Sequence, residues 1–313
     1  MFYSCLRRSY ENNHGKVLMR IFGTGDFHAR DTQPRNRVDP YMPTLLWKFH
    51  HVMEKTLPGD VVILPGDITD AHKVSDELKT LLIEEFSKYR DRHLLVVYGQ
   101  HDQQNRDRNL RDTAFGVLTA SKVVTVLSER PLEIGNCLFY GSSYNQGIPR
   151  LLRKSDKYRV LVTHKMLSDK DYWFGKVKYS SADAFLDRHK FDLIVSGDNH
   201  HAFTTSLEGR SLVNCGSWMR SKTDQATHRP MFVVWQDGKL EKHFIPIEEI
   251  VLKLEEKKEK PKNRNLEVFI RTLKDVKNPE LDFISDLEKD LKEVEPVEGE
   301  EEILWEAVNK KRK

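Results

Sequence analysis

Short apolar runs that end at a polar turn recur along the first 250 residues of the chain. The clearest run extends from Val61 to Leu64, and a Pro-Gly turn after it leads directly to Asp67. An apolar run of this length without polar alternation is typical of a strand buried on both faces of a parallel sheet. Further strand-like runs lie at 20–24, 93–97, 122–126, 159–163 and 191–195.

Segments with helical periodicity separate these runs. The best example spans 41–57, where apolar residues recur at Leu45, Phe49 and Val52. Because strands and helices alternate, the pattern predicts an α/β fold. Further helices are predicted at 74–89, 110–120 and 181–189. Turns that contain glycine predict β-hairpins at 132–140, 202–213 and 231–245.

The pattern changes near residue 250, where we place a domain boundary. The main domain is predicted to span 19–250. A dense mixed-charge run follows it, so 251–313 is predicted to be a charged linker leading to a small helical addition. Residues 1–18 contain no apolar segment of the kind found in signal peptides. We predict that they form a disordered extension, with Met19 as an alternative start of the protein.

Composition excludes several classes of protein. The chain has 313 residues, of which 32% are charged, but the formal net charge is only +3, so composition alone does not indicate nucleic-acid binding. No apolar run approaches the length of about 18 residues that a membrane span needs. The three cysteines, Cys5, Cys137 and Cys215, are far apart and odd in number, which fits a reducing cytoplasm rather than a disulfide framework.

Side chains that bind metal ions follow five of the strand-like runs. They are Asp26 and His28, Asp67, Gln100 with His101 and Asp102, His164, and Asp198 with His200. Each has a simpler explanation when taken alone: a turn-forming aspartate, or a histidine on the surface. Taken together they predict one metal site, because the carboxyl ends of parallel strands meet at one edge of a sheet.

The mixture of donors indicates the kind of metal. Carboxylate and amide oxygens with a few imidazoles suit Mn²⁺, with Mg²⁺, Fe²⁺ and Zn²⁺ as alternatives. So many donors favour two divalent metal ions, and a pair about 3.5–4 Å apart is suited to in-line displacement at phosphorus. The sequence contains neither a GxxxxGK[ST] phosphate loop nor a GxSxG elbow.

In order along the chain, these motifs resemble the signature of the calcineurin-like metallophosphoesterases. That signature is D-x-H, GD, GNHD, H and GHxH, and the resemblance covers about residues 19–245. It implies a sandwich of two mixed β-sheets flanked by helices. The segment GDITDAHKVSDEL and the later GQHD most resemble the SbcD-type DNA repair and recombination nucleases, including bacteriophage members.

The resemblance also implies a role for each residue. Asp26, His28, Asp67 and His200 hold one metal ion, and Asp67 bridges to the second. Gln100, His164 and Asp198 complete the second site. His101 contacts the phosphate or protonates the leaving oxygen, and Asp102 orients it.

Two positions depart from the family pattern. Gln100 stands where the family has Asn, and Asp198 stands where it has His. The extra carboxylate lowers the summed charge of ligands and ions from about +2 to about +1, which favours Mn²⁺ over Zn²⁺. Because both changes fall at the same ion, we interpret them as a retuned site.

For the substrate, the sequence leaves three hypotheses open. The first is a DNA exonuclease or endonuclease, in which Arg30, Arg35 and Arg37 contact backbone phosphates, although these arginines also fit a solvated loop. The second is a phosphatase or nucleotide phosphodiesterase with a small substrate. The third is a DNA-binding scaffold without catalysis. In the first case the resemblance implies a coiled-coil ATPase partner of the SbcC type, a homodimer, and a C-terminal segment that caps the domain or docks the partner.

Overall fold

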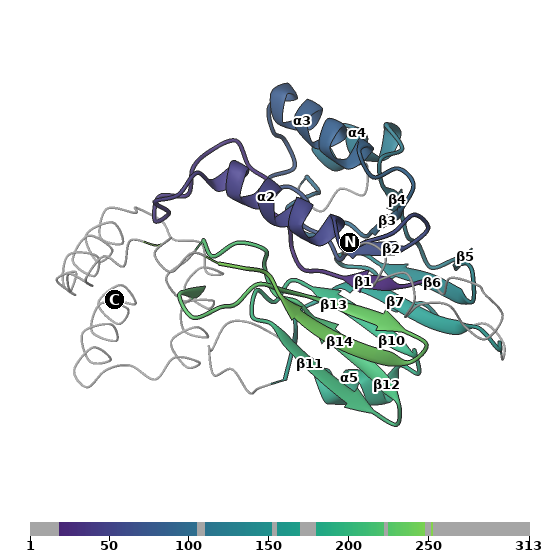
Figure 1. The fold of residues 1–313 in the computed structure, drawn as a ribbon. Helices are drawn as coiled ribbons and strands as arrows, with labels where there is room; N and C mark the ends of the chain where they lie inside the picture. Colours follow the sequence, from purple (N-terminus) through teal and green to yellow (C-terminus); the bar gives the residue numbers. More distant parts are fainter. Residues whose placement is uncertain are drawn as a thin grey trace, which may run out of the picture. The chain divides into compact units, whose positions relative to one another are not determined.

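Two β-sheets form the centre of the protein in the computed structural model (Figure 1). The structure describes residues 19–104, 110–151, 155–169, 180–221, 225–247 and 252. All of them belong to one compact unit of the chain, Met1–Tyr172 with Lys178–Leu254. The predicted extension 1–18 lies outside the described residues, as does the predicted linker and helical addition at 251–313 apart from Leu252, so both stay predictions.

The first sheet has six strands and contains the N-terminal strand of the fold. Its strands are, in spatial order, β14 (Lys239–Phe244), β13 (Met231–Gln236), β1 (Ile21–Gly23), β2 (Val61–Leu64), β3 (His93–Val96) and β4 (Thr125–Val126). From β1 to β4 the pairing is parallel, and β13 joins β1 in antiparallel orientation. The carboxyl ends of β1, β2 and β3 therefore meet at one edge.

The second sheet also has six strands. In spatial order they are β11 (Phe203–Leu207), β12 (Arg210–Asn214), β10 (Leu193–Gly197), β7 (Tyr158–His164), β6 (Cys137–Ser142) and β5 (Leu132–Ile134). Here β6, β7, β10 and β12 are parallel. A separate two-stranded sheet pairs β8 (Leu167–Ser168) with β9 (Ser180–Ser181).

Apolar residues from both sheets fill the space between them. Ile63 of β2, Val162 of β7 and Val195 of β10 are fully buried in this shared core. Three helices, α2 (Tyr41–Met53), α3 (Asp76–Ser87) and α4 (Ala114–Ala120), pack on the outer face of the first sheet. On the second sheet, α5 (Ala182–Arg188) packs through Phe185 and Leu186. This arrangement confirms the predicted sandwich of two mixed sheets flanked by helices.

The three predicted hairpins are present as the antiparallel pairs β5–β6, β11–β12 and β13–β14. In the β13–β14 hairpin, Asp237 and Gly238 both have positive φ, 47° and 81°, as a two-residue turn with the right twist requires. The helices are shorter than predicted by a few residues at their ends, because the apolar periodicity extends into the flanking turns. Within the part of the chain that the structure describes, no helix has the length and apolar character needed to cross a membrane.

Candidate metal centre

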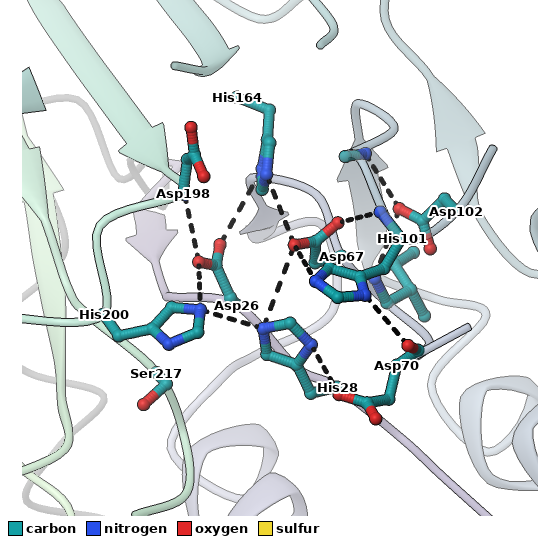
Figure 2. Close-up of polar contacts among 12 residues, drawn as sticks. Asp26, His28, Asp67, Asp70, His101, Asp102, His164, Asp198, His200 and Ser217 are labelled. Atoms are coloured by element: carbon teal, nitrogen blue, oxygen red, sulfur yellow. Dashed lines mark hydrogen bonds and ion pairs between the residues drawn. The ribbon is translucent and has the colours of Figure 1, made fainter. Parts of the chain in front are cut away.

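The strand ends at one edge of the two sheets bring the predicted ligands other than Gln100 close together (Figure 2). Asp26 and His28 follow β1, Asp67 follows β2, and His164 is the last residue of β7. His28, Asp67 and Asp198 have positive φ values of 52°, 47° and 78°. Residues other than glycine adopt this conformation uncommonly, and outside a tight turn the surrounding structure must hold them in it.

Glycines next to the ligands make the close packing of these loops possible. A Cβ atom on Gly99 would lie 2.0 Å from Asp67 Oδ1. A Cβ atom on Gly197 would lie 2.4 Å from Asp26 Oδ1. The glycines of the GQHD and GDNH segments are therefore required by the approach of a neighbouring carboxylate. A Cβ atom on Gly66 of the GD segment would lie 2.3 Å from His164 Nδ1, so this glycine is required by the approach of the His164 ring.

Asp26, His28 and His200 form the first group of donors. The Nε2 atoms of His28 and His200 are 3.1 Å apart, and His200 Nε2 is 3.7 Å from Asp26 Oδ2. Two donors bound at right angles to one ion, each at about 2.1 Å, would lie about 3 Å apart. The three side chains thus present donor atoms at the spacing that a single ion needs.

The second group of donors centres on Asp67. Its Oδ2 atom lies 3.4 Å from His164 Nε2, 3.9 Å from His28 Nε2 and 4.0 Å from His101 Nε2. Within the described part of the chain, Asp26 Oδ1, Asp67 Oδ2 and His164 Nε2 are buried and have no hydrogen-bond partner. Buried polar atoms without a partner are costly, so these donors fit divalent cations that supply the missing interactions.

The hydrogen bond on the far side of His164 fixes which nitrogen faces the site. His164 Nδ1 lies 2.9 Å from the carbonyl oxygen of Pro65 and can only donate to it. Nε2 is therefore the nitrogen that faces Asp67, at 3.4 Å from Oδ2, and the one that a metal ion could bind. Metal-binding histidines are commonly held in this way.

The electrostatics of the site favour a cation. Burial raises the pKa of Asp26 to about 7. Burial would lower the pKa of His164, but the nearby Asp67 carboxylate raises it to about 10. Burial likewise opposes the charge on Asp67, yet the His164 imidazolium holds the pKa of Asp67 below its ordinary value. The raised pKa of His164 and the lowered pKa of Asp67 both mean that a positive charge beside Asp67 is favourable, and a divalent ion can supply such a charge.

The side chains of the two residues that depart from the family pattern make fewer contacts with the other candidate ligands. Gln100 is exposed to solvent. Asp198 donates its backbone amide to Asp26 Oδ2 at 3.0 Å, and Figure 2 shows its carboxylate directed away from Asp26. Burial raises the pKa of Asp198, and His164 opposes this rise. Their assignment to the second ion stays a prediction.

The hydrogen bonds of the Asp102 side chain go to backbone amides and not to the ring of His101, so its predicted role in orienting His101 stays a prediction. Asp102 is fully buried and accepts hydrogen bonds from the backbone amides of Ile68, Thr69 and Gly99 at 3.3, 3.1 and 2.9 Å. It joins the loop after β2 to the loop after β3. The ring of His101 is held instead by the carbonyl oxygen of Asp70, 2.9 Å from Nδ1.

Two residues that sequence reasoning did not select also contact the site. The Asp70 carboxylate lies 3.4 Å from His28 Nδ1. The carboxamide of Gln225 lies 3.2 Å from His200 Nδ1 and also contacts the Ser217 hydroxyl. Asp70 follows Asp67 by three residues in the same loop, which is a weak sequence signal. Gln225 lies far from any motif, and only the folded structure places it here.

The three arginines after the first ligand pair have different environments. Arg35 is exposed and lines a cavity of about 280 Å³ together with His28, His101 and His200. Arg30 lines the same cavity and pairs with Asp70 at 3.3 Å.

Arg37 does not fit the predicted role of a DNA contact. It is buried, pairs with Asp39 at 2.5 Å and donates to the carbonyl oxygen of Arg220 at 2.7 Å. Its guanidinium therefore stabilises the loop that precedes α2 and is not available to an external phosphate.

Comparison with known proteins agrees with this geometry. The family model described as calcineurin-like phosphoesterase matches residues 19–202. The chain is 26% identical over 230 residues to the DNA double-strand break repair protein Mre11 of Haloferax volcanii, covering 68% of this chain and 48% of that protein. It is 25% identical over 233 residues to Mre11 of Halobacterium salinarum, covering 69% and 56%. The chain thus spans about half the length of these relatives.

A solved structure shows the same fold. Purple acid phosphatase PPD1 from yellow lupin (Lupinus luteus) aligns with a TM-score of 0.50 and 11% identity, covering 72% of this chain and 51% of that one. At this identity the similarity concerns the fold alone.

Proposed function

The chain belongs to the calcineurin-like phosphoesterase family, and from this premise we propose that it is a metal-dependent phosphodiesterase that cleaves DNA. The observation that carries the proposal is the convergence of His28 and His200, with Nε2 atoms 3.1 Å apart, beside the buried carboxylates of Asp26 and Asp67. The similarity to two Mre11 proteins, described as DNA double-strand break repair proteins, supports DNA as the substrate.

In this proposal the metal-binding residues have the roles that the family resemblance implies. Asp26, His28, Asp67 and His200 hold one divalent ion, and Asp67 with His164, Gln100 and Asp198 holds the second, with Mn²⁺ favoured by the oxygen-rich set. Such a pair of ions lowers the pKa of a bound water and neutralises charge on a phosphodiester. These carboxylates and imidazoles would hold both ions at the edge of the two sheets.

His101 supplies the proton in the proposed reaction. Its Nδ1 is 2.9 Å from the carbonyl oxygen of Asp70, so Nδ1 is a donor and Nε2 is the atom that exchanges a proton. Nε2 lies 4.0 Å from Asp67 Oδ2, and the side chain of His101 is 40% exposed. A protonated Nε2 can therefore reach the leaving oxygen of a bound phosphodiester and protonate it.

Arg35 provides the first contact with DNA outside the metal centre. Its side chain is exposed on the wall of the same cavity, where a positive charge attracts the phosphate backbone. We extend the proposal to a coiled-coil ATPase partner of the SbcC type and to a homodimer. Both extensions rest on the resemblance to the SbcD-type nucleases.

A substrate comparison tests the proposal. Purified protein with Mn²⁺ is incubated with linear duplex DNA, single-stranded DNA, an aryl phosphodiester and an aryl phosphomonoester. Cleavage of DNA and of the aryl diester is expected. Hydrolysis of the small esters without cleavage of DNA would identify a small-substrate enzyme. Binding of DNA without turnover of any substrate would identify a scaffold.

A further inference from the structure

Asp70 contacts both histidines on which the proposed chemistry depends (Figure 2). Its Oδ1 atom lies 3.4 Å from His28 Nδ1, and its backbone carbonyl oxygen lies 2.9 Å from His101 Nδ1. The other carboxylate oxygen, Oδ2, lies 3.3 Å from the Arg30 guanidinium. One residue therefore faces a metal-binding imidazole with its side chain and the proton donor with its backbone.

The backbone at Asp70 is held from two directions. Its amide donates to the carbonyl oxygen of Ala29 at 2.9 Å, and the amide of the preceding Thr69 donates to Asp102 Oδ1 at 3.1 Å. The Asp70 carbonyl is consequently fixed in place by the backbone, so the orientation of His101 does not depend on the Asp70 side chain. The contributions of the side chain and of the backbone can be separated by mutation.

The Asp70 carboxylate provides an acceptor for a proton on His28 Nδ1. Both nitrogens of a histidine that binds metal through Nε2 need a defined state, with a proton on Nδ1 and a lone pair on Nε2. His28 Nδ1 is buried and makes no hydrogen bond within the described part of the chain, and the Asp70 carboxylate is its charged neighbour. The Arg30 guanidinium pairs with the other oxygen of the same carboxylate.

We propose that Asp70 is a positioning residue that fixes the ring and the tautomer of His28 for metal binding. The inference rests on the proposed function, because it assumes that His28 binds a divalent ion. The outer partner of a metal-binding histidine typically contributes about 10–100-fold to metal affinity. Loss of the Asp70 carboxylate is expected to weaken Mn²⁺ binding by that factor, while His101 stays in place.

Titration calorimetry with MnCl₂ on the metal-free full-length protein measures this effect without any DNA substrate. The test variant is Asp70→Ala, and Asp70→Asn is a second variant that keeps the size of the side chain and a neutral acceptor. Asp31→Ala is the matched control, since Asp31 lies in the same region and its carboxylate contacts Ser75, not a histidine. Thermal unfolding verifies that each variant is folded.

We expect Asp70→Ala to bind Mn²⁺ about 10–100-fold more weakly than wild type, Asp70→Asn to lose less, and Asp31→Ala to bind as wild type does. Hydrolysis of an aryl phosphodiester by Asp70→Ala should recover at saturating Mn²⁺. Folded Asp70 variants with wild-type Mn²⁺ affinity would overturn this inference and leave the proposed function intact. A wild-type protein that binds no Mn²⁺ would overturn both.

Discussion

The Nε2 atoms of His28 and His200 lie 3.1 Å apart although 172 positions separate the two residues in the sequence. His28 follows the first strand of one sheet, and His200 follows β10 of the other. The metal centre therefore depends on how the two sheets pack, and the shared apolar core between them positions its ligands. A change in the packing of the two sheets would therefore also change the distance between these two donor atoms.

His101→Ala tests the proposed proton donor. Removing a positioned general acid typically lowers the rate by about 10²–10⁴-fold, so kcat for an aryl phosphodiester should fall by this factor. The bound manganese, measured by elemental analysis, should be unchanged. His101 also lies in a group of candidate donors with His28 and Asp67, so loss of one manganese equivalent would instead identify His101 as a ligand.

Asp102→Ala should act on stability more than on the chemical step. The substitution leaves three backbone amides, at Ile68, Thr69 and Gly99, without their acceptor. Buried donors without partners are costly, and we expect the free energy of unfolding to fall by about 3 kcal/mol or more. Urea unfolding measures this loss. A variant with wild-type stability and a selective loss of kcat would instead support the predicted role of Asp102 in orienting His101.

Arg35 and Arg37 should respond in opposite ways to replacement by alanine. Arg35→Ala should weaken DNA binding and reduce the slope of log K against log salt concentration by about 1, with no change in melting temperature. Arg37→Ala removes the buried partner of a partly buried ion pair with Asp39 and should lower the free energy of unfolding by about 2 kcal/mol. Fluorescence anisotropy at several salt concentrations and thermal unfolding separate the two. Equal effects of the two variants on both measurements would contradict the assignment.

Lys48 gives a pH dependence of stability outside the metal centre. Burial lowers its pKa from 10.5 to about 7, and Arg37 adds to the decrease. Its ammonium group donates to the carbonyl oxygen of Trp218 at 2.8 Å.

The sign of the effect follows from proton binding. Between pH 7 and 10.5 the unfolded chain keeps a proton on Lys48 that the folded chain has lost, so stability rises with pH in this window. Relative to Lys48→Met, the free energy of unfolding of the wild type should increase by up to about 1.4 kcal/mol per pH unit. Urea unfolding of both proteins at pH 7, 8 and 9 measures this difference. A difference that stays constant over this range would contradict the lowered pKa.

The strand ends were predictable from sequence for a physical reason. Apolar runs that finish at Gly66-Asp67 or at His164 indicate buried parallel strands, and parallel strands deliver their carboxyl ends to the same edge. The alternation of strands and helices and the convergence of these residues follow from that pattern, whereas the division into two sheets was expected only from the resemblance to the calcineurin-like metallophosphoesterases. The glycines beside these residues also mark the places where the strand ends come close together, since a bulkier residue would collide with a neighbouring ligand.

The partners of each side chain were not predictable in the same way. Asp102 and Arg37 are charged residues in or near the motifs, and only loop packing determines that one binds backbone amides and the other the Asp39 carboxylate. Asp70 contacts the ring of His28, and Gln225 contacts the ring of His200; only the tertiary structure brings these side chains together. Sequence patterns predict the residue that a strand delivers, whereas the contacts of loop residues require the folded chain.

Equilibrium binding of manganese to the wild-type protein and to Asp67→Asn tests most directly whether this sheet edge is a two-ion centre. Asparagine keeps the size of the side chain and tolerates the positive φ of 47° at this position, so the variant removes mainly the charge. Two bound equivalents in the wild type, and weaker binding of both in Asp67→Asn, are the predicted result. Failure of the wild type to bind manganese, or unchanged binding of two ions by Asp67→Asn, would contradict it.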